Sequence, residues 1–328
     1  MTSLIDVHHH VLPPPYTREL ATAGIEALPG YGFPDWSPSR SLEMMDENGI
    51  ELAVLSVSAP GLYFGEAAQT RRLARECNEY LAELVSAESR FGAFGCLPIP
   101  DVEDSIAEAE LVLEQLGFHG VVMYTNSAGI YPGDPRLAPL MTYLSDRRAV
   151  VFVHPVQPCG QVEAPLLIRP SILEFVFETT RAATSLITGR CLSRYPDIRW
   201  ILTHGGGTLP YLAERLGHLR RDKAVEHRES LDVEADLHSF YFDVTSCSQS
   251  HALRCLTAVA AEDRLLFGSD FPFETGDSAA EAAALLRAIP DVANGGLAGL
   301  WRANAAALFD MVDGRVVDES KAAGRPHI

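Results

Sequence analysis

The residues best placed to do chemistry in this sequence are histidines near the N-terminus. Residues 4–10 read Leu-Ile-Asp-Val-His-His-His, an apolar run that ends in three histidines. In an extended strand His8 and His10 would point to one face and His9 to the other. Two imidazoles on one face can bind a single metal ion. The remnant of an affinity tag is the alternative, but tags usually carry more histidines and lie outside a strand.

Three further apolar runs end in comparable residues, namely His154, His204 and Asp270. Any one of them alone would more often be structural, but together with the first run they favour one shared site. Three neutral imidazoles and one carboxylate form a nitrogen and oxygen donor set that suits Zn²⁺, Mn²⁺ or Fe²⁺. His204 precedes three glycines, so its loop could approach a substrate closely, and we assign it to proton transfer or substrate polarisation.

The elements that must position these residues follow a regular order. Short apolar, β-branched runs alternate with longer segments of helical periodicity. This alternation predicts a single-domain (β/α)₈ TIM barrel, whose strands end at one catalytic face. A doubly wound sheet is the main alternative, but no G-x-G-x-x-G follows the first run. The predicted strands cover residues 4–8, 51–57, 91–96, 119–124, 149–154, 198–204, 240–245 and 264–269. The predicted helices cover 66–88, 103–116, 136–147, 171–194, 250–261, 278–288 and 297–310.

The segments outside these elements indicate the domain organisation. We expect one barrel domain over residues 1–312 and a loose tail, or an arm on a neighbouring subunit, over 313–328. Two long insertions, 11–40 and 155–170, follow the first and fifth predicted strands and are rich in proline. In a barrel both would leave the catalytic face, so we expect them to act as lids.

Composition excludes several classes of partner. The net charge of −18 argues against nucleic acid and anionic membranes, both of which require a basic surface. No apolar stretch is long enough to span a bilayer and no secretory signal is recognised, so we expect a cytoplasmic protein. The six cysteines form no C-x-x-C pair, which fits reduced thiols. Cys247 follows a predicted strand, but a core position is favoured over a nucleophile.

The scarcity of lysine separates two kinds of metal site. Only Lys223 and Lys321 occur, and neither lies near a predicted strand end. Binuclear barrel hydrolases generally bridge their two metals with a carboxylated lysine at the end of the fourth strand, where this chain reads Val-Met-Tyr-Thr-Asn (122–126). The sequence therefore favours a mononuclear site, and it disfavours a Schiff-base mechanism.

Four motifs carry a family resemblance. They are Asp-Val-His-His-His-Val-Leu-Pro-Pro (6–14), Val-Phe-Val-His-Pro (151–155), Ile-Leu-Thr-His-Gly-Gly-Gly-Thr-Leu-Pro (201–210) and Leu-Phe-Gly-Ser-Asp-Phe-Pro (266–272). The chain resembles the amidohydrolase superfamily, and more narrowly the decarboxylase branch that includes aminocarboxymuconate semialdehyde, 6-methylsalicylate and γ-resorcylate decarboxylases.

The resemblance implies a metal-dependent, non-oxidative decarboxylase of a small phenolic or enolic carboxylic acid. It implies one divalent metal ion, with Zn²⁺ expected and Mn²⁺ as the alternative, and a homodimer. Protonation of the ring carbon would come from the region of His204 and Asp270. The implied residues are His8, His10, His154 and Asp270 as metal ligands, His204 and Asp270 as catalytic residues, and Arg181 and Phe271 at the substrate.

Other activities stay open at this point. A metal-dependent hydrolase of an amide, ester or lactone needs the same residues, so the motifs do not exclude it. A hydratase of a dicarboxylic acid is a further enzymatic alternative. A barrel that only binds a ligand is disfavoured because no motif position is degraded.

Overall fold

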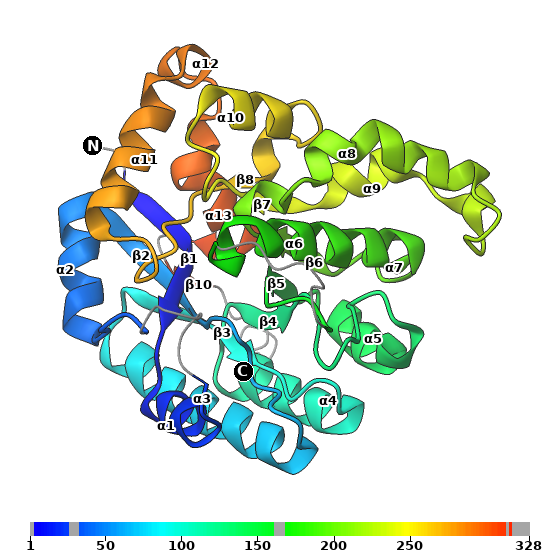
Figure 1. The fold of residues 1–328 in the computed structure, drawn as a ribbon. Helices are drawn as coiled ribbons and strands as arrows, with labels where there is room; N and C mark the ends of the chain where they lie inside the picture. Colours follow the sequence, from blue (N-terminus) through cyan, green and yellow to red (C-terminus); the bar gives the residue numbers. More distant parts are fainter. Residues whose placement is uncertain (1–2, 26–32, 161–167, 313–314, 317–328) are drawn as a thin grey trace, which may run out of the picture.

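The computed structural model describes residues 3–25, 33–160, 168–312 and 315–316, and its core is a ring of eight parallel strands in sequence order (Figure 1). Backbone bonds from Val7 to Phe267 and from Asp270 to His8 join the last strand to the first. This closure confirms the predicted (β/α)₈ barrel. The strands are β1 (Leu4–Val11), β2 (Ile50–Val57), β3 (Phe91–Cys96), β4 (Gly120–Tyr124), β5 (Val150–His154), β6 (Arg199–Leu202), β7 (Tyr241–Asp243) and β8 (Leu265–Leu266).

Helices surround this ring and cover its outer face (Figure 1). Because the strands are covered outside and packed inside, nearly all of their residues are buried, as expected for a parallel sheet. The main helices are α1 (Pro14–Thr22), α2 (Pro38–Asn48), α3 (Ala67–Ala87), α4 (Val102–Glu110), α5 (Ala138–Asp146), α6 (Pro170–Thr188), α8 (Leu209–Leu216), α9 (Val233–Ser239), α10 (Ser250–Thr257), α11 (Gly276–Ala288) and α13 (Ala303–Leu308).

Aromatic side chains fill the barrel interior beneath the catalytic face. The rings of Phe94 and Phe152 stack with centroids 5.0 Å apart, and both are fully buried. The ring of Phe152 also meets the edge of His8, with centroids 5.1 Å apart. The interior is therefore a packed core whose upper layer supports the histidines of β1.

Several predicted elements are shorter or broken in the structure. The predicted helix 171–194 is two helices, α6 and the short α7 (Cys191–Arg194), separated at Gly189. A Cβ at Gly189 would lie 2.4 Å from the carbonyl oxygen of Gly133, so only glycine fits where the chain turns. The helices α1, α2, α8 and α9 were not predicted, and each is short, with 7 to 11 residues.

The predicted tail and lids fall largely outside the described residues. A short antiparallel pair, β9 (Met311–Val312) with β10 (Arg315–Val316), carries the chain past the proposed domain boundary, and residues 317–328 are not described. The lid predictions include residues 26–32 and 161–167, which also lie outside the description. No helix in the described part of the chain has the length and apolar character needed to span a membrane.

Candidate metal centre and active-site cavity

Four of the predicted residues converge at the C-terminal face of the barrel. His8, His10, His154 and Asp270 each offer one donor atom, and these atoms all lie within 4.8 Å of one another. Oδ1 of Asp270 is 3.3 Å from Nε2 of His8 and 3.1 Å from Nε2 of His10. A cluster of this size and composition could hold one divalent metal ion.

The two histidines of β1 are held from behind through their other ring nitrogen. Nδ1 of His8 lies 2.9 Å from Oδ2 of Asp243, at the end of β7. Nδ1 of His10 lies 3.0 Å from Oγ of Ser56, near the end of β2. These partners fix each ring's tautomer with the hydrogen on Nδ1, which leaves both Nε2 lone pairs directed at the cluster.

The charges around the cluster favour a cation. Burial alone would lower the pKa of His8, but the carboxylates of Asp243 and Asp270 outweigh it and raise the pKa to about 10. Burial lowers the pKa of His10 and of His154, so these two rings are neutral and keep their lone pairs. Burial would raise the pKa of Asp270, but His8 and the neighbouring histidines hold it well below its usual range. The cluster therefore attracts positive charge, which a proton on His8 supplies here and a metal ion could supply instead. The three imidazoles and one carboxylate are suitable ligands for a divalent ion.

His204 lies beside the cluster at the mouth of the barrel. Its Nε2 is 3.5 Å from Oδ2 of Asp270, and its backbone N–H donates to Oδ1 of Asp243 at 3.0 Å. His204 and Asp270 both have left-handed backbone conformations, with φ of 53° and 59°. Non-glycine residues in this region are strained and concentrate at functional sites.

The glycines after His204 pack closely against neighbouring elements. Gly207 has φ of 66°, and a Cβ there would lie 2.0 Å from the carbonyl oxygen of Val176 on α6. A Cβ at Gly205 would lie 2.4 Å from the Sγ of Cys247. Cys247 itself is buried beneath them, and burial raises the pKa of its thiol to about 12, as expected for a core residue.

Two imidazole nitrogens at the centre differ from those of β1. Nδ1 of His154 and Nδ1 of His204 are buried, and neither has a hydrogen-bond partner among the described residues. Buried polar atoms are nearly always paired, so these two nitrogens need a partner that the described chain does not supply. A substrate, a water molecule or a metal ion would meet this need.

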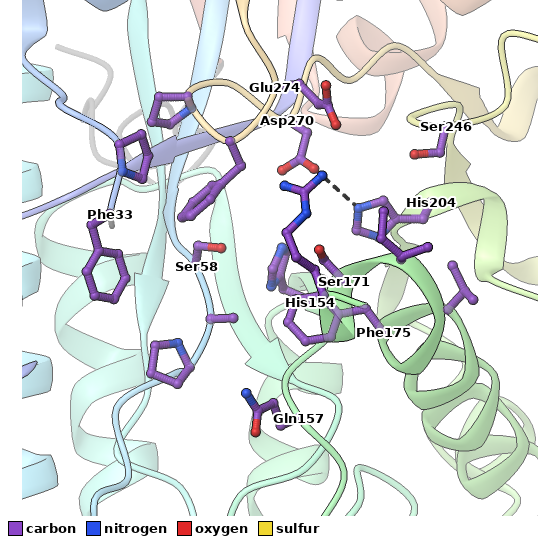
Figure 2. Close-up of a pocket in the computed structure, with 18 of the residues that line it drawn as sticks. Phe33, Ser58, His154, Gln157, Ser171, Phe175, His204, Ser246, Asp270 and Glu274 are labelled. Carbon is purple, nitrogen blue, oxygen red and sulfur yellow. Dashed lines mark hydrogen bonds and ion pairs between the residues drawn. The ribbon is translucent and has the colours of Figure 1, made fainter. Parts of the chain in front are cut away.

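A cavity of about 420 Å³ opens directly above the cluster. Figure 2 shows Phe33 and Ser58 on one side of it and His204 and Ser246 on the other, with Asp270 between them. Its volume and mixed apolar and polar walls are typical of a small-molecule site. The lining residues are Ile25, Phe33, Pro34, Ser58, Ala59, Pro60, His154, Gln157, Arg169, Ser171, Ile172, Phe175, Val176, His204, Ser246, Asp270, Pro272, Phe273 and Glu274.

The two predicted substrate residues do not line this cavity. Arg181 lies well inside α6 with 67% of its side chain exposed, and its Nε is 3.3 Å from Oε1 of Glu178. Phe271 is buried behind β1, where its ring packs against His9 with centroids 5.1 Å apart. The structure instead places Arg169 and Phe273 on the cavity wall. Arg169 immediately precedes α6 and lines the cavity, whereas Arg181 lies further along the same helix and does not.

Sequence reasoning also missed the partners of the histidines. Asp243 and Ser56 stand near the ends of the predicted strands 240–245 and 51–57, although neither belongs to a recognisable motif. Their position was the available signal, because a polar residue at a strand end of a barrel faces the catalytic mouth.

Comparison with known proteins identifies the family of the chain. Residues 5–311 match the amidohydrolase family model. Decarboxylase yanB of Aspergillus niger is 37% identical over 284 residues, which cover 82% of this chain and 77% of the relative. The 6-methylsalicylic acid decarboxylase acuB of Aspergillus aculeatus is 32% identical over 82% of this chain and 84% of its own length.

A solved structure extends the likeness to the whole fold. The dihydroxybenzoic acid decarboxylase of Polaromonas sp. JS666, with bound manganese and the inhibitor 2-nitroresorcinol, matches with a TM-score of 0.79 at 22% identity. The match covers 97% of this chain and all of the other chain. Together, the matched motifs, the barrel and its histidine and aspartate cluster show that this chain belongs to the amidohydrolase family.

Proposed function

We propose that this chain is a metal-dependent, non-oxidative decarboxylase of a small phenolic carboxylic acid of the salicylate type. The observation that carries the proposal is the convergence of His8, His10, His154 and Asp270 beneath a cavity of about 420 Å³, which has room for a substituted aromatic ring. The two Aspergillus decarboxylases named above are 37% and 32% identical to this chain over 82% of its length. This likeness favours decarboxylation over hydrolysis of an amide, ester or lactone, which the motifs alone left open.

In this proposal the four clustered side chains are the metal ligands. A bound divalent ion would supply Lewis acidity and would orient the substrate carboxylate with an adjacent ring oxygen. Asp243 and Ser56 would keep His8 and His10 in the binding tautomer. We propose Zn²⁺ as the ion, with Mn²⁺ as the alternative, because a site of three imidazoles and one carboxylate suits both. The Polaromonas structure contains manganese.

His204 is proposed to move the proton. Its ring lies at the cavity wall, 3.5 Å from Asp270, and its Nδ1 has no partner among the described residues. Decarboxylation requires one proton at the ring carbon that bears the carboxylate. The carbon–carbon bond then breaks, its electron pair returns to the ring, and carbon dioxide leaves. His204 donates this proton, with Asp270 orienting the imidazole.

The cavity walls fit an aromatic acid. Phe33, Phe175 and Phe273 give it apolar faces on which a ring can pack. Arg169 is the one arginine among the described lining residues, and no lysine accompanies it there. We propose that Arg169 attracts the anionic substrate. Burial and the neighbouring Asp270 raise the pKa of Glu274 on the same wall, and Arg169 opposes that rise.

The direct test is carbon dioxide release from 2-hydroxybenzoates by the metal-replete protein. Ester and lactone hydrolysis is measured beside it on the same sample. We expect carbon dioxide and the corresponding phenol in equal amounts, and no release after chelation. Lactone or ester turnover with no carbon dioxide from any 2-hydroxybenzoate would reject the proposal in favour of a hydrolase.

We also propose a cytoplasmic homodimer. Ile172 and Phe177 on α6 and Tyr211 on α8 are exposed large apolar residues, and such residues are common at subunit interfaces. Light scattering coupled to gel filtration measures the oligomeric state, and a mass of 35.7 kDa would identify a monomer instead.

A further inference from the structure

The face of β1 that points away from the metal centre carries a second chain of hydrogen bonds. Nδ1 of His9 lies 3.0 Å from Oδ2 of Asp6, and Nε2 of His9 lies 2.9 Å from Oγ of Ser41 on α2. The indole Nε1 of Trp36 is also 2.9 Å from Oγ of Ser41. Asp6, His9 and Ser41 are fully buried. Solvent therefore does not compete for these bonds, and a broken link would leave buried polar atoms unpaired.

The two ends of this chain determine its direction. The indole N–H of Trp36 can only donate, so Oγ of Ser41 accepts from it. The hydroxyl hydrogen of Ser41 is then free to donate to Nε2 of His9. The other nitrogen, Nδ1, must carry the hydrogen that the carboxylate of Asp6 accepts. Every bond then has one donor and one acceptor, with His9 in a single tautomer.

The Asp6 end holds the metal-binding strands. Its carboxylate accepts from the backbone N–H of His8 at 3.1 Å and from the backbone N–H and hydroxyl of Ser269 at 3.0 and 2.6 Å. Ser269 directly precedes Asp270. The buried Asp6 thus joins the strand that carries His8 to the turn that carries Asp270.

The Trp36 end holds a wall of the cavity. Phe33 and Pro34 line the cavity just before Trp36, and Ser37 then caps α2. Figure 2 shows the Phe33 ring at the side of the cavity opposite His204. Residues 33–37 form neither helix nor strand, so side-chain anchors such as the indole bond of Trp36 must fix their position.

We propose that Trp36 and Ser41 are positioning residues that, through His9, set the Phe33–Pro34 wall at a fixed distance from the metal centre. This wall packs against the aromatic ring of the substrate, so the inference rests on the proposed function. This set of hydrogen bonds contacts no reacting atom, so its loss should weaken substrate binding and leave the chemical step unchanged. The role of the middle histidine is to connect the metal-binding strand to the specificity wall.

The test compares Ser41→Ala with Ser41→Thr, which keeps the hydroxyl, and with Ser39→Ala, which removes an exposed hydroxyl from the same helix. Ser41→Ala removes both hydrogen bonds of the Ser41 hydroxyl and so breaks the link between Trp36 and His9. We expect KM for 2-hydroxybenzoate to rise about fivefold, the factor that corresponds to roughly 1 kcal/mol. The turnover number and the bound metal should stay at their starting values. Ser41→Thr should recover most of the affinity, and Ser39→Ala should match the unmodified protein.

Trp36→Phe tests whether the indole of Trp36 acts through the hydroxyl of Ser41. Alone it should raise KM by a similar factor, because phenylalanine keeps an aromatic ring but has no N–H. Combined with Ser41→Ala it should add little, since the indole acts only through the serine. Full additivity of the two changes, or loss of metal in either single variant, would overturn the inference.

An indole resonance provides a readout that needs no turnover. The chain has three tryptophans, so its nitrogen–proton spectrum should contain three indole signals, and Trp36→Phe identifies one of them. Ser41→Ala should move that signal and speed its exchange with water, whereas Ser39→Ala should not. An unmoved signal would overturn the inference even if the protein decarboxylates 2-hydroxybenzoates. A moved signal without any carbon dioxide release would support the anchoring and reject the proposed function.

Discussion

The histidines on the two sides of the metal centre differ in whether their Nδ1 atom has a hydrogen-bond partner. On β1, His8 and His10 each have an Nδ1 partner on another strand, Asp243 and Ser56 respectively. On β5 and after β6, His154 and His204 have a buried Nδ1 with no partner in the described part of the chain. All four rings lie close together, with His8 and His204 centroids 5.0 Å apart.

This difference indicates a division of labour. The rings of His8 and His10 are already held through Nδ1, so they lose little freedom when an ion binds at Nε2. The β1 side is therefore preorganised for the metal. On the other side, His154 completes the proposed ligand set, whereas the ring of His204 lines the cavity and is available to the substrate or to a proton. Asp243 bridges the two sides, because it accepts from His8 through one oxygen and from the backbone of His204 through the other.

The largest effect is expected where the two sides share a ligand. Asp270→Asn removes the negative charge that contacts His8, His10 and His204. We expect loss of the bound metal, measured by elemental analysis, and a fall in kcat of about 10³-fold or more. Metal content and activity close to those of the unmodified protein would show that Asp270 is not a ligand.

His204→Asn separates chemistry from metal binding. The proposed proton donor is lost while the ligands stay, so kcat should fall about 10²- to 10⁴-fold with normal metal content. Elemental analysis and steady-state kinetics on the same sample check this result. If the metal is lost as well, His204 belongs with the ligands and the two sides are not distinct.

Asp243→Asn weakens the preorganised side alone. Its amide can still accept from the backbone of His204 but presents an N–H toward Nδ1 of His8, which disturbs the tautomer. Metal affinity should fall about 10- to 100-fold, as when other metal-bound histidines lose a partner. Competition with a chromogenic chelator measures the affinity. Asp236→Asn, an acidic residue on α9 outside the site, is the matched control, and equal losses in both variants would contradict the assignment.

Ser56→Ala should produce the smallest effect. Nδ1 of His10 still has the backbone oxygen of Ser56 at 3.3 Å, so its tautomer is retained. We expect metal affinity to fall about threefold, less than one full hydrogen bond is worth. A loss as large as that of Asp243→Asn would mean that the hydroxyl alone orients the ring.

The sequence predicts the barrel and the clustered residues because both leave local signals. Each strand is an apolar run, and His8, His10, His154 and Asp270 stand at the ends of such runs. The end of a strand is therefore enough to place a residue at the barrel mouth.

The remaining features depend on distant pairing and on helix phase. Asp243 reaches His8 across 235 positions of sequence, and no local pattern shows that contact. Arg181 looked suitable as a substrate residue, but its turn of α6 faces outward, whereas Arg169 just before the helix lines the cavity. Likewise, the turn after Asp270 places Phe273 on the cavity and Phe271 behind β1, which strand alternation would have put on one face.

Titration of activity with metal in two variants tests the division of labour most directly. Asp243→Asn and His204→Asn are stripped of metal, and carbon dioxide release is followed as Zn²⁺, and separately Mn²⁺, is added back. We predict that excess metal restores Asp243→Asn most of the way to the unmodified rate and leaves His204→Asn inactive at full occupancy. Restoration of His204→Asn by metal, or an Asp243→Asn variant that stays inactive when fully loaded, would contradict the account.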